Sequence, residues 1–160
     1  MKIAKQDTDF TNPHRGRPAG FFSSLLRMTY YWLDYLLGVP VMVRRHAKFD
    51  RFLIFDRYIY DFVVDPLRSS IKLPRWLRML FVKLTPEPNL VLILLTDADT
   101  IYRRKAELTV DEIKRQLGEY QRLAKDKSRF VVLDASQNPE AITRDAVKII
   151  LEKISISSNV

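Results

Sequence analysis

An acidic residue, a basic residue and a tyrosine stand together at Asp56, Arg57 and Tyr58. They follow a compact apolar run at residues 52–55, which is too short for a helix and is typical of a strand buried on both faces. Open α/β sheets keep their ligand crevices at the carboxyl ends of their strands. The sequence therefore predicts a crevice at Asp56 and Arg57. The alternative is that Asp56 caps the next helix and Arg57 is an ordinary surface cation.

Two further apolar runs indicate strands that would position this site. Residues 89–96, NLVLILLT, form a continuous Val, Ile and Leu run, and residues 130–134, FVVLD, form a shorter one. Helices are predicted at residues 74–84, 100–108, from Thr109 onward, and at 139–154. Asp97 and Asp99 can cap the second of them. Strands that alternate with helices favour an α/β fold with parallel strands.

The N-terminal part of the chain is predicted to be helical after a flexible lead-in at residues 1–19. We expect one helix at residues 21–37, ending near Gly38 and buried on more than one side, and a second at residues 41–48. Residues 21–43 have the length of a membrane span, but Arg27 and Asp34 would each cost roughly 2.5 to 3.5 kcal/mol near the bilayer centre. No transmembrane segment is therefore predicted, and attachment to a membrane surface stays an alternative.

Composition limits the kinds of site and partner. The 160 residues suit one domain, predicted at residues 20–154 with a tail at 155–160. The absence of cysteine excludes disulfides and thiolate metal sites, and His14 and His46 are too few for a histidine-rich site. The net charge of +8 favours anionic partners such as nucleotides, nucleic acid or acidic lipid. A cytoplasmic location is the default expectation.

Four segments, taken in order, resemble thymidylate kinases and their bacterial thymidylate kinase-like relatives. They are residues 30–38 (YYWLDYLLG), 54–66 (IFDRYIYDFVVDP), 88–108 (PNLV at its start and RKAEL at its end) and 132–140 (VLDASQNPE). Together they cover most of residues 21–151. The resemblance implies a P-loop nucleotide-kinase-like fold in three layers, here an incomplete one with a short parallel sheet flanked by helices.

The resemblance also implies a reaction, the transfer of the γ-phosphoryl group of ATP to a nucleoside monophosphate with Mg²⁺. In that reaction positioning and charge neutralisation supply most of the catalysis. Asp56 would place Mg²⁺ or the acceptor, Arg57 would hold phosphate oxygens, and Tyr58 would contact the nucleotide. Further nucleotide-binding residues would be the lid cations Arg103, Arg104 and Lys105, and Ser136 and Gln137 beside the adenine. The alternatives are a solvated helix face for the three cations and a helix cap for Ser136.

The sequence departs from this family at the P-loop. None of its four glycines, Gly16, Gly20, Gly38 and Gly118, begins a G-x-x-x-x-G-K-[ST] motif, so tight ATP binding by this chain alone is not expected. Where relatives usually carry an acidic residue followed by prolines, this chain has residues 95–98, LTDA, so the resemblance does not imply specificity for thymidylate. In the family the P-loop strand lies between the strands that match residues 52–55 and 90–95. Their edges are therefore expected to be unpaired and open to another chain.

The sequence thus predicts the carboxy-terminal portion of a kinase-like protein, or the product of a truncated or split gene. The leading hypothesis is a phosphotransferase module that is inactive without a P-loop half, with a nucleotide or another phosphorylated small molecule as its ligand. Its further partners would be that missing half or other copies of the chain. The alternative is a non-enzymatic remnant that binds nucleotides, nucleic acid or a protein partner, with nucleic acid the less favoured.

Overall fold

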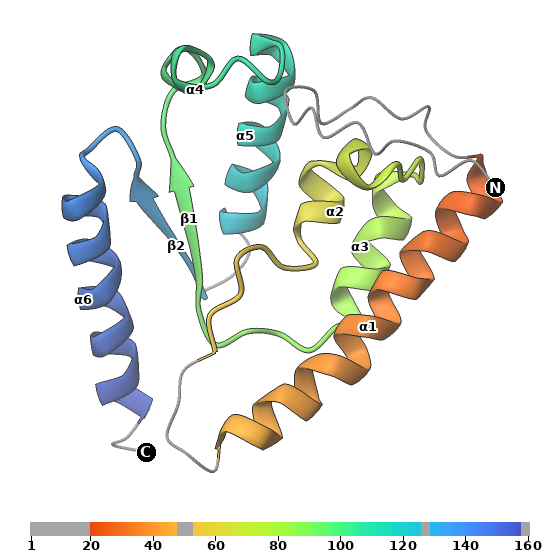
Figure 1. The fold of residues 1–160 in the computed structure, drawn as a ribbon, viewed down its shortest axis with the longest axis horizontal. Helices are drawn as coiled ribbons and strands as arrows, with labels where there is room; N and C mark the ends of the chain where they lie inside the picture. Colours follow the sequence, from red (N-terminus) through yellow and green to blue (C-terminus); the bar gives the residue numbers. More distant parts are fainter. Residues whose placement is uncertain (1–19, 48–52, 126–128, 158–160) are drawn as a thin grey trace, which may run out of the picture.

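The computed structural model describes residues 20–47, 53–125 and 129–157 (Figure 1). The elements, in chain order, are α1 (Phe21–Ala47), α2 (Asp61–Val64), the 3-10 helix η1 (Pro66–Ser69), α3 (Arg75–Lys83), β1 (Val91–Leu95), α4 (Ala98–Arg104), α5 (Val110–Lys125), β2 (Phe130–Asp134) and α6 (Pro139–Ser157). The predicted lead-in at residues 1–19 and residues 158–160 of the predicted tail lie outside the described residues, and residues 155–157 of that tail belong to α6. The mixed α/β class is confirmed, with mostly helices and one short sheet.

The sheet consists of β1 and β2, which pair in parallel. Val91 lies opposite Phe130, and Leu95 lies opposite Asp134. Both strands had been predicted from their continuous apolar runs. The connection between them contains α4 and α5, and in Figure 1 α5 and α6 lie on either side of the two strands. Their carboxyl ends therefore meet at one edge of the sheet, beside α4 and the start of α6.

The prediction of a strand at residues 52–55 is wrong for the residues that the structure describes. Phe52 lies outside the described residues, and residues 53–55 have no strand conformation. Ile54 is 85% exposed, whereas a strand buried on both faces would cover it. A strand needs a neighbour for its backbone N–H and C=O groups, and among the described residues β1 pairs with β2 alone. Without such a neighbour, this apolar segment runs as irregular chain toward Tyr58.

The first helical segment is continuous, where two helices had been predicted. α1 runs from Phe21 to Ala47 with Pro40 inside it. Proline removes one backbone hydrogen bond and costs about 3 kcal/mol in a helix interior. Aromatic packing holds the turns before it, because Tyr31 stacks on Phe62 at a ring-centroid distance of 5.1 Å. No helix in the described part of the chain has both the length and the apolarity needed to cross a bilayer.

The core lies between α1, α2, α3 and α5. Its most deeply buried side chains are Met28, Ile59, Val63, Val64 and Ile71. α1 contributes one face to this core and leaves its opposite face exposed, so the expectation of burial on more than one side is wrong. A helix at the edge of a single core has nothing to cover its second face.

Two arginines donate hydrogen bonds to the carbonyl groups at the carboxyl end of the four-residue helix α2. Arg78 Nη1 donates to the carbonyl oxygens of Phe62 and Val63 at 3.0 and 2.7 Å, and Arg115 Nη2 donates to Val64 O at 2.7 Å. The last carbonyl groups of a helix have no partner within it and carry partial negative charge, so cations stabilise them. Burial, and next the charge of Arg115, lower the pKa of Arg78. These contacts fix α2 against α3 and α5.

Candidate functional site

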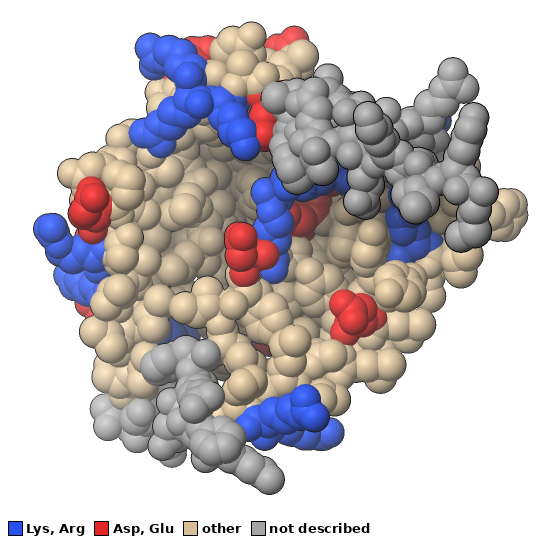
Figure 2. All heavy atoms as spheres, viewed as in Figure 1, with Lys and Arg blue, Asp and Glu red and all other residues tan. Residues whose placement is uncertain are grey.

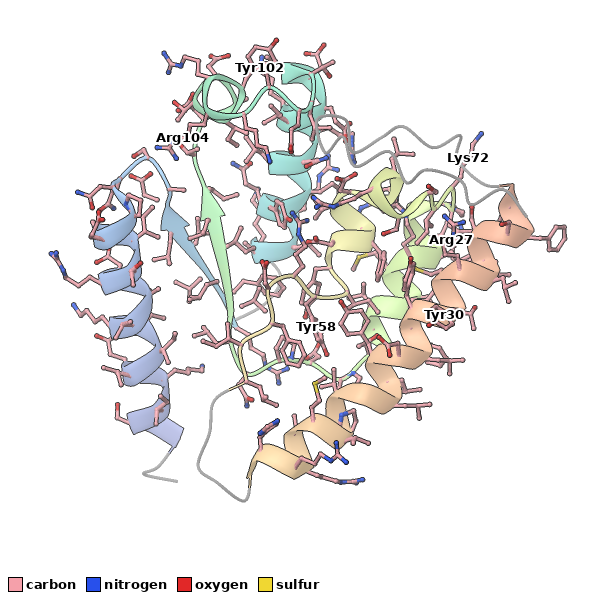
Figure 3. All side chains as sticks on the ribbon, in the orientation of Figure 1. Arg27, Tyr30, Tyr58, Lys72, Tyr102 and Arg104 are labelled. Atoms are coloured by element: carbon pink, nitrogen blue, oxygen red, sulfur yellow. The ribbon has the colours of Figure 1, made fainter. Side chains whose placement is uncertain are left out.

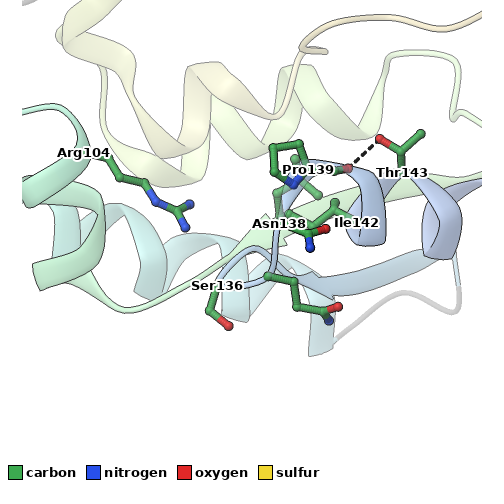
Figure 4. A pocket seen from close by; sticks show the side chains of 8 residues that line it. Arg104, Ser136, Asn138, Pro139, Ile142 and Thr143 are labelled. Atoms are coloured by element: carbon green, nitrogen blue, oxygen red, sulfur yellow. Dashed lines mark hydrogen bonds between the residues drawn. The ribbon is translucent and has the colours of Figure 1, made fainter.

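A cleft of about 710 Å³ opens beside the carboxyl ends of the two strands (Figure 4). Its volume falls within the range of small-molecule sites. Its walls come from β1, the end of α4, the loop after β2 and the first turns of α6. The lining residues are Leu94, Arg104, Ser136, Gln137, Asn138, Pro139, Ile142 and Thr143. Three of the predicted nucleotide-binding residues, Arg104, Ser136 and Gln137, are therefore brought together.

Arg104 reaches the cleft because a capped helix follows β1 directly. Asp97 accepts a hydrogen bond from the Thr100 backbone N–H at 2.8 Å and caps α4, as predicted. The hydrogen bonds to Thr100 lower the pKa of Asp97. At the other end of α4, Arg104 Nη1 donates to Ala135 O at 2.8 Å. This contact joins α4 to the loop after β2 and holds the guanidinium at the cleft wall, as Figure 4 shows.

Short polar side chains within the loop after β2 hold this loop in place through hydrogen bonds to backbone N–H groups. Asp134 accepts a hydrogen bond from the Ser136 N–H at 2.8 Å, and hydrogen bonding with Ser136 lowers the Asp134 pKa. Asn138 Oδ1 accepts from the Ala141 N–H at 2.8 Å and so caps α6. The alternative role of Ser136 as that cap is therefore wrong. The Asn-Pro pair at 138–139 was the missed signal, because proline favours the first helical position and asparagine the cap.

The three predicted lid cations do not gather around one point. Arg104 lines the cleft, but Arg103 Nη2 donates to the Thr100 hydroxyl at 3.2 Å on its own helix. Lys105 forms an ion pair with Glu107, with Nζ and Oε1 2.6 Å apart. All three cations are exposed. A single guanidinium therefore faces the cleft in this arrangement.

Asp56, Arg57 and Tyr58 lie in a different part of the molecule and do not line the cleft. Figure 3 shows Tyr58 among the central helices, well apart from Arg104. The Tyr58 hydroxyl donates to Pro86 O at 2.6 Å, and burial, then the neighbouring tyrosines, raise its pKa to about 12. Asp56 is exposed. Of the predicted site residues, three thus line the cleft (Arg104, Ser136 and Gln137), and five do not (Asp56, Arg57, Tyr58, Arg103 and Lys105).

Arg57 is held in an unusual backbone conformation. Its φ of 78° lies in the left-handed region, which costs a non-glycine residue roughly 1 to 2 kcal/mol. Its Nη1 forms an ion pair with Asp61 Oδ2 at 2.5 Å, and Asp61 Oδ1 accepts from the Tyr120 hydroxyl at 3.1 Å. Sequence reasoning missed Asp61 and Tyr120, although the four-residue spacing of Arg57 and Asp61 was a signal. Strain of this kind occurs at functional sites when surrounding contacts fix it.

Asp56 was predicted as a magnesium ligand. Among the residues that the structure describes, no group of three histidine or acidic side chains is placed to hold a metal ion. Mg²⁺ is usually held by one or two carboxylates together with the phosphates of a nucleotide. Asp56 therefore fits only a metal that arrives with a phosphorylated ligand, and Mg²⁺ and ATP remain predictions from the resemblance.

A charge network around the buried carboxylate of Glu119 supports these elements, and the sequence revealed only part of it. Glu119 on α5 accepts from Arg75 Nε of α3 at 2.9 Å and from Arg122 Nη1 at 2.7 Å. Burial raises the pKa of Glu119, but the two arginines outweigh that effect and the net pKa is lowered. Arg122 stands three residues after Glu119 and was a local signal. Arg75 is distant in sequence and gave none.

Comparisons of the chain with protein-family models, with curated proteins and with solved structures find no match. Evidence for a function therefore comes from the cleft and from the residues that line it.

Proposed function

We propose that the chain is a nucleotide-binding module of the thymidylate kinase-like kind, which binds a nucleotide or another phosphorylated small molecule in the cleft. The observation that carries this proposal is the convergence of Arg104, Ser136 and Gln137 at the carboxyl ends of two parallel strands. Crevices at this edge are the usual ligand sites of open α/β sheets. Arg104 lies about thirty positions before Ser136 and Gln137 in the sequence, so the fold brings them together.

The chemistry of the cleft suits a ligand that is anionic at one end and flat or apolar at the other. A guanidinium has five N–H donors in a fork that matches phosphate oxygens, and Arg104 places one of its nitrogens on Ala135 O. Leu94 and Ile142 supply apolar wall, against which a base could pack. The Ser136 hydroxyl and the Gln137 amide supply polar groups for the edge of that base.

Phosphoryl transfer by this module would need a P-loop from a further segment or a second chain. The described residues contain no glycine-rich cradle of backbone N–H groups for the β- and γ-phosphates. The edge of β1 that faces away from β2 has no strand beside it in the described part of the chain. A strand that carries the P-loop would add there. By itself the chain binds ligand and does not turn it over.

Calorimetric titration with ATP and Mg²⁺, and separately with thymidine monophosphate, tests the proposal. Replacing Arg104 with alanine should weaken binding by roughly 10- to 100-fold, because a hydrogen bond to a charged group contributes about 1.5 to 3 kcal/mol. Arg103→Ala is the matched control, since it removes the same charge one residue away and should change affinity less than about threefold. Equal losses in both variants, or no binding by the unchanged protein, would contradict the proposal.

Nucleic acid is the less favoured ligand. Figure 2 shows basic side chains in several separate groups around this face, where a nucleic-acid surface would carry a continuous stripe. A single-stranded oligonucleotide should therefore bind weakly, and salt should abolish that binding steeply. Oligonucleotide binding tighter than ATP binding would favour the non-enzymatic alternative.

A further inference from the structure

The outer face of α1 carries a long apolar stripe. Six side chains form it and all are exposed: Phe22, Leu26, Tyr30, Leu33, Leu37 and Val41. Phe22 is 84% exposed, Leu26 74% and Leu37 64%. Spacings of three and four residues place all six on one side of a helix, along about 29 Å of its length. Contiguous apolar surface of this extent marks a site that meets a partner or a membrane.

The stripe cannot turn inward, because the opposite face of α1 is fixed to the protein. Ser24 and Met28 are fully buried there. The Ser24 hydroxyl accepts a hydrogen bond from the Lys72 N–H at 2.9 Å, and Arg27 Nη1 donates to Ser69 O at 3.0 Å. Figure 3 shows Arg27 and Lys72 together at this junction, with Tyr30 further along the same helix. The stripe is thus held toward the outside.

The neighbouring helix α3 also exposes apolar side chains. The Trp32 ring of α1 meets the Phe81 ring of α3 edge to face, with ring centroids 5.8 Å apart. Leu84 stands three residues after Phe81, about one helical turn, and both Leu84 and Trp76 are exposed. Tryptophan and tyrosine are enriched at membrane–water interfaces, where one part of the side chain is in contact with lipid and the other with water. Exposed apolar surface is therefore not limited to α1.

The stripe ends in two basic side chains. Arg44 and Arg45 follow Val41 by three and four residues, so they continue its side of the helix, and both are exposed. Long arginine side chains can lie along apolar surface while their guanidinium groups reach phosphate oxygens. Asp34 is the one acidic residue of α1, and α3 contains none. An apolar face with a basic end is complementary to an anionic lipid surface.

These charges fit a lipid surface better than a second copy of the chain. In a parallel pair of α1 helices the two arginine pairs would meet, and like charges at an interface are costly. In an antiparallel pair each arginine pair would lie beside the start of the other α1, whose first turn contains no acidic residue. Anionic headgroups instead attract cations that lie near the membrane surface.

We infer that α1 docks the protein on an anionic membrane surface, with the stripe in the headgroup region and Arg44 and Arg45 at lipid phosphates. The helix would lie in the plane of that surface, because its opposite face is fixed to the protein. Figure 1 shows α1 on the side of the molecule opposite β1, β2 and α6, so a docked protein keeps its cleft open to solvent. The inference does not depend on the cleft or its ligand.

Flotation with vesicles of equimolar phosphatidylglycerol and phosphatidylcholine tests the docking. The unchanged full chain should float with the vesicles, and Leu26→Asp and Leu37→Asp should each lower the ratio of bound to free protein at least about tenfold, because a charge replaces an apolar side chain that enters lipid. Leu151→Asp is the matched control, because Leu151 is also an exposed leucine but lies on α6. That variant should float like the unchanged protein. No flotation of the unchanged protein, or equal losses in all three variants, would overturn the inference.

The charged residues give a second test that leaves the stripe intact. Arg44→Gln and Arg45→Gln should each weaken binding to the same vesicles about fivefold, the contribution of one cation near an anionic surface. Asp34→Asn should strengthen binding several-fold, because it removes a carboxylate from the docked helix. Arg103→Gln is the matched control, since it removes an exposed cation from α4 and should change binding less than about twofold. Equal losses in Arg44→Gln and Arg103→Gln would show that net charge alone binds the vesicles, and would overturn the inference.

A polarity-sensitive fluorophore tests which face enters the lipid. The chain contains no cysteine, so a label on an introduced cysteine has no background. Emission from a label at Leu26→Cys or Leu37→Cys should shift to shorter wavelength when vesicles are added, and emission at Leu151→Cys should not. A shift at all three positions would overturn the inference. Sedimentation velocity covers the other occupant: a dimer that Leu26→Asp dissociates, in a protein that binds no vesicles, would assign the stripe to a second copy and also overturn it.

Discussion

The helical region and the sheet region of this molecule are packed very differently. The helical region, made of α1, α2, α3 and α5, contains side chains with almost no exposure, such as Met28 and Val64. The sheet region, made of β1, β2 and α6, buries Ile93 and Leu133 but leaves Leu94 57% exposed. Parallel sheets are usually covered on both faces, and this one is covered in part. Stability therefore resides in the helices, while the cleft lies on the less covered region.

The largest expected difference between the two regions is in the effect of truncating one side chain in each. Met28→Ala should lower the free energy of unfolding by about 2 to 5 kcal/mol, because it leaves a cavity in the buried core. Leu94→Ala, on the exposed wall of the cleft, should lower it by less than about 1 kcal/mol. Urea unfolding followed by circular dichroism measures both. Equal losses at the two positions would break the comparison.

The charge network between α3 and α5 gives a smaller effect that depends on pH. Glu119→Gln should cost roughly 1 to 2 kcal/mol at neutral pH, since its arginine partners are partly exposed. The lowered pKa of Glu119 means that its contribution is present above its unfolded pKa, near 4.5, and is lost as pH falls through the folded pKa. The stability difference between the unchanged protein and the variant should therefore shrink below about pH 4.5. A difference that stays constant down to pH 3 would argue against this network.

The cap of α6 tests the sheet region itself. Asn138→Ala removes the acceptor for the Ala141 N–H and should cost about 1 kcal/mol. Because this region is less densely packed, the loss should appear first as faster hydrogen exchange in the first turns of α6. Uniform acceleration across α1, α3 and α6 would indicate that the two regions unfold as one unit.

The smallest expected change in stability comes from Ser136→Ala. The Ser136 side chain is exposed and caps no helix, so thermal unfolding should shift by less than about 0.5 kcal/mol. Loss of a hydroxyl at the cleft should nevertheless weaken ATP binding a few-fold, as judged by calorimetry. A destabilised protein with unchanged affinity would reverse the roles assigned to this loop.

The sequence predicted the elements whose structure is decided locally. Residues 91–95 and 130–134 are strands because continuous branched apolar runs end at polar turn residues, and Asp97 caps α4 as expected. Residues 53–55 carry the same apolar signal, but a strand also needs a neighbour, which no local pattern supplies. The continuity of α1 through Pro40 and its single buried face depend likewise on what packs against it.

The candidate site was predicted in the same uneven way. Arg104, Ser136 and Gln137 meet because they follow two strands that pair in parallel, so the strand predictions were enough to bring them together. Asp56, Arg57 and Tyr58 follow a segment that does not join the sheet among the described residues, and they do not reach the cleft. The contacts of Arg57 with Asp61, and of Asp61 with Tyr120, depend on the packing of α2 against α5. The sequence therefore gave only a weak signal for them.

Hydrogen–deuterium exchange of the full chain, with and without ATP and Mg²⁺, tests the nucleotide-binding cleft most directly. Slower exchange is predicted at residues 100–105 and 134–143, with little change in the helical region. The same protection should persist in Arg103→Ala, whereas Arg104→Ala should need a roughly 10- to 100-fold higher ATP concentration to reach it. Protection confined to residues 56–61, or none at saturating ATP, would contradict a ligand site at the carboxyl ends of β1 and β2.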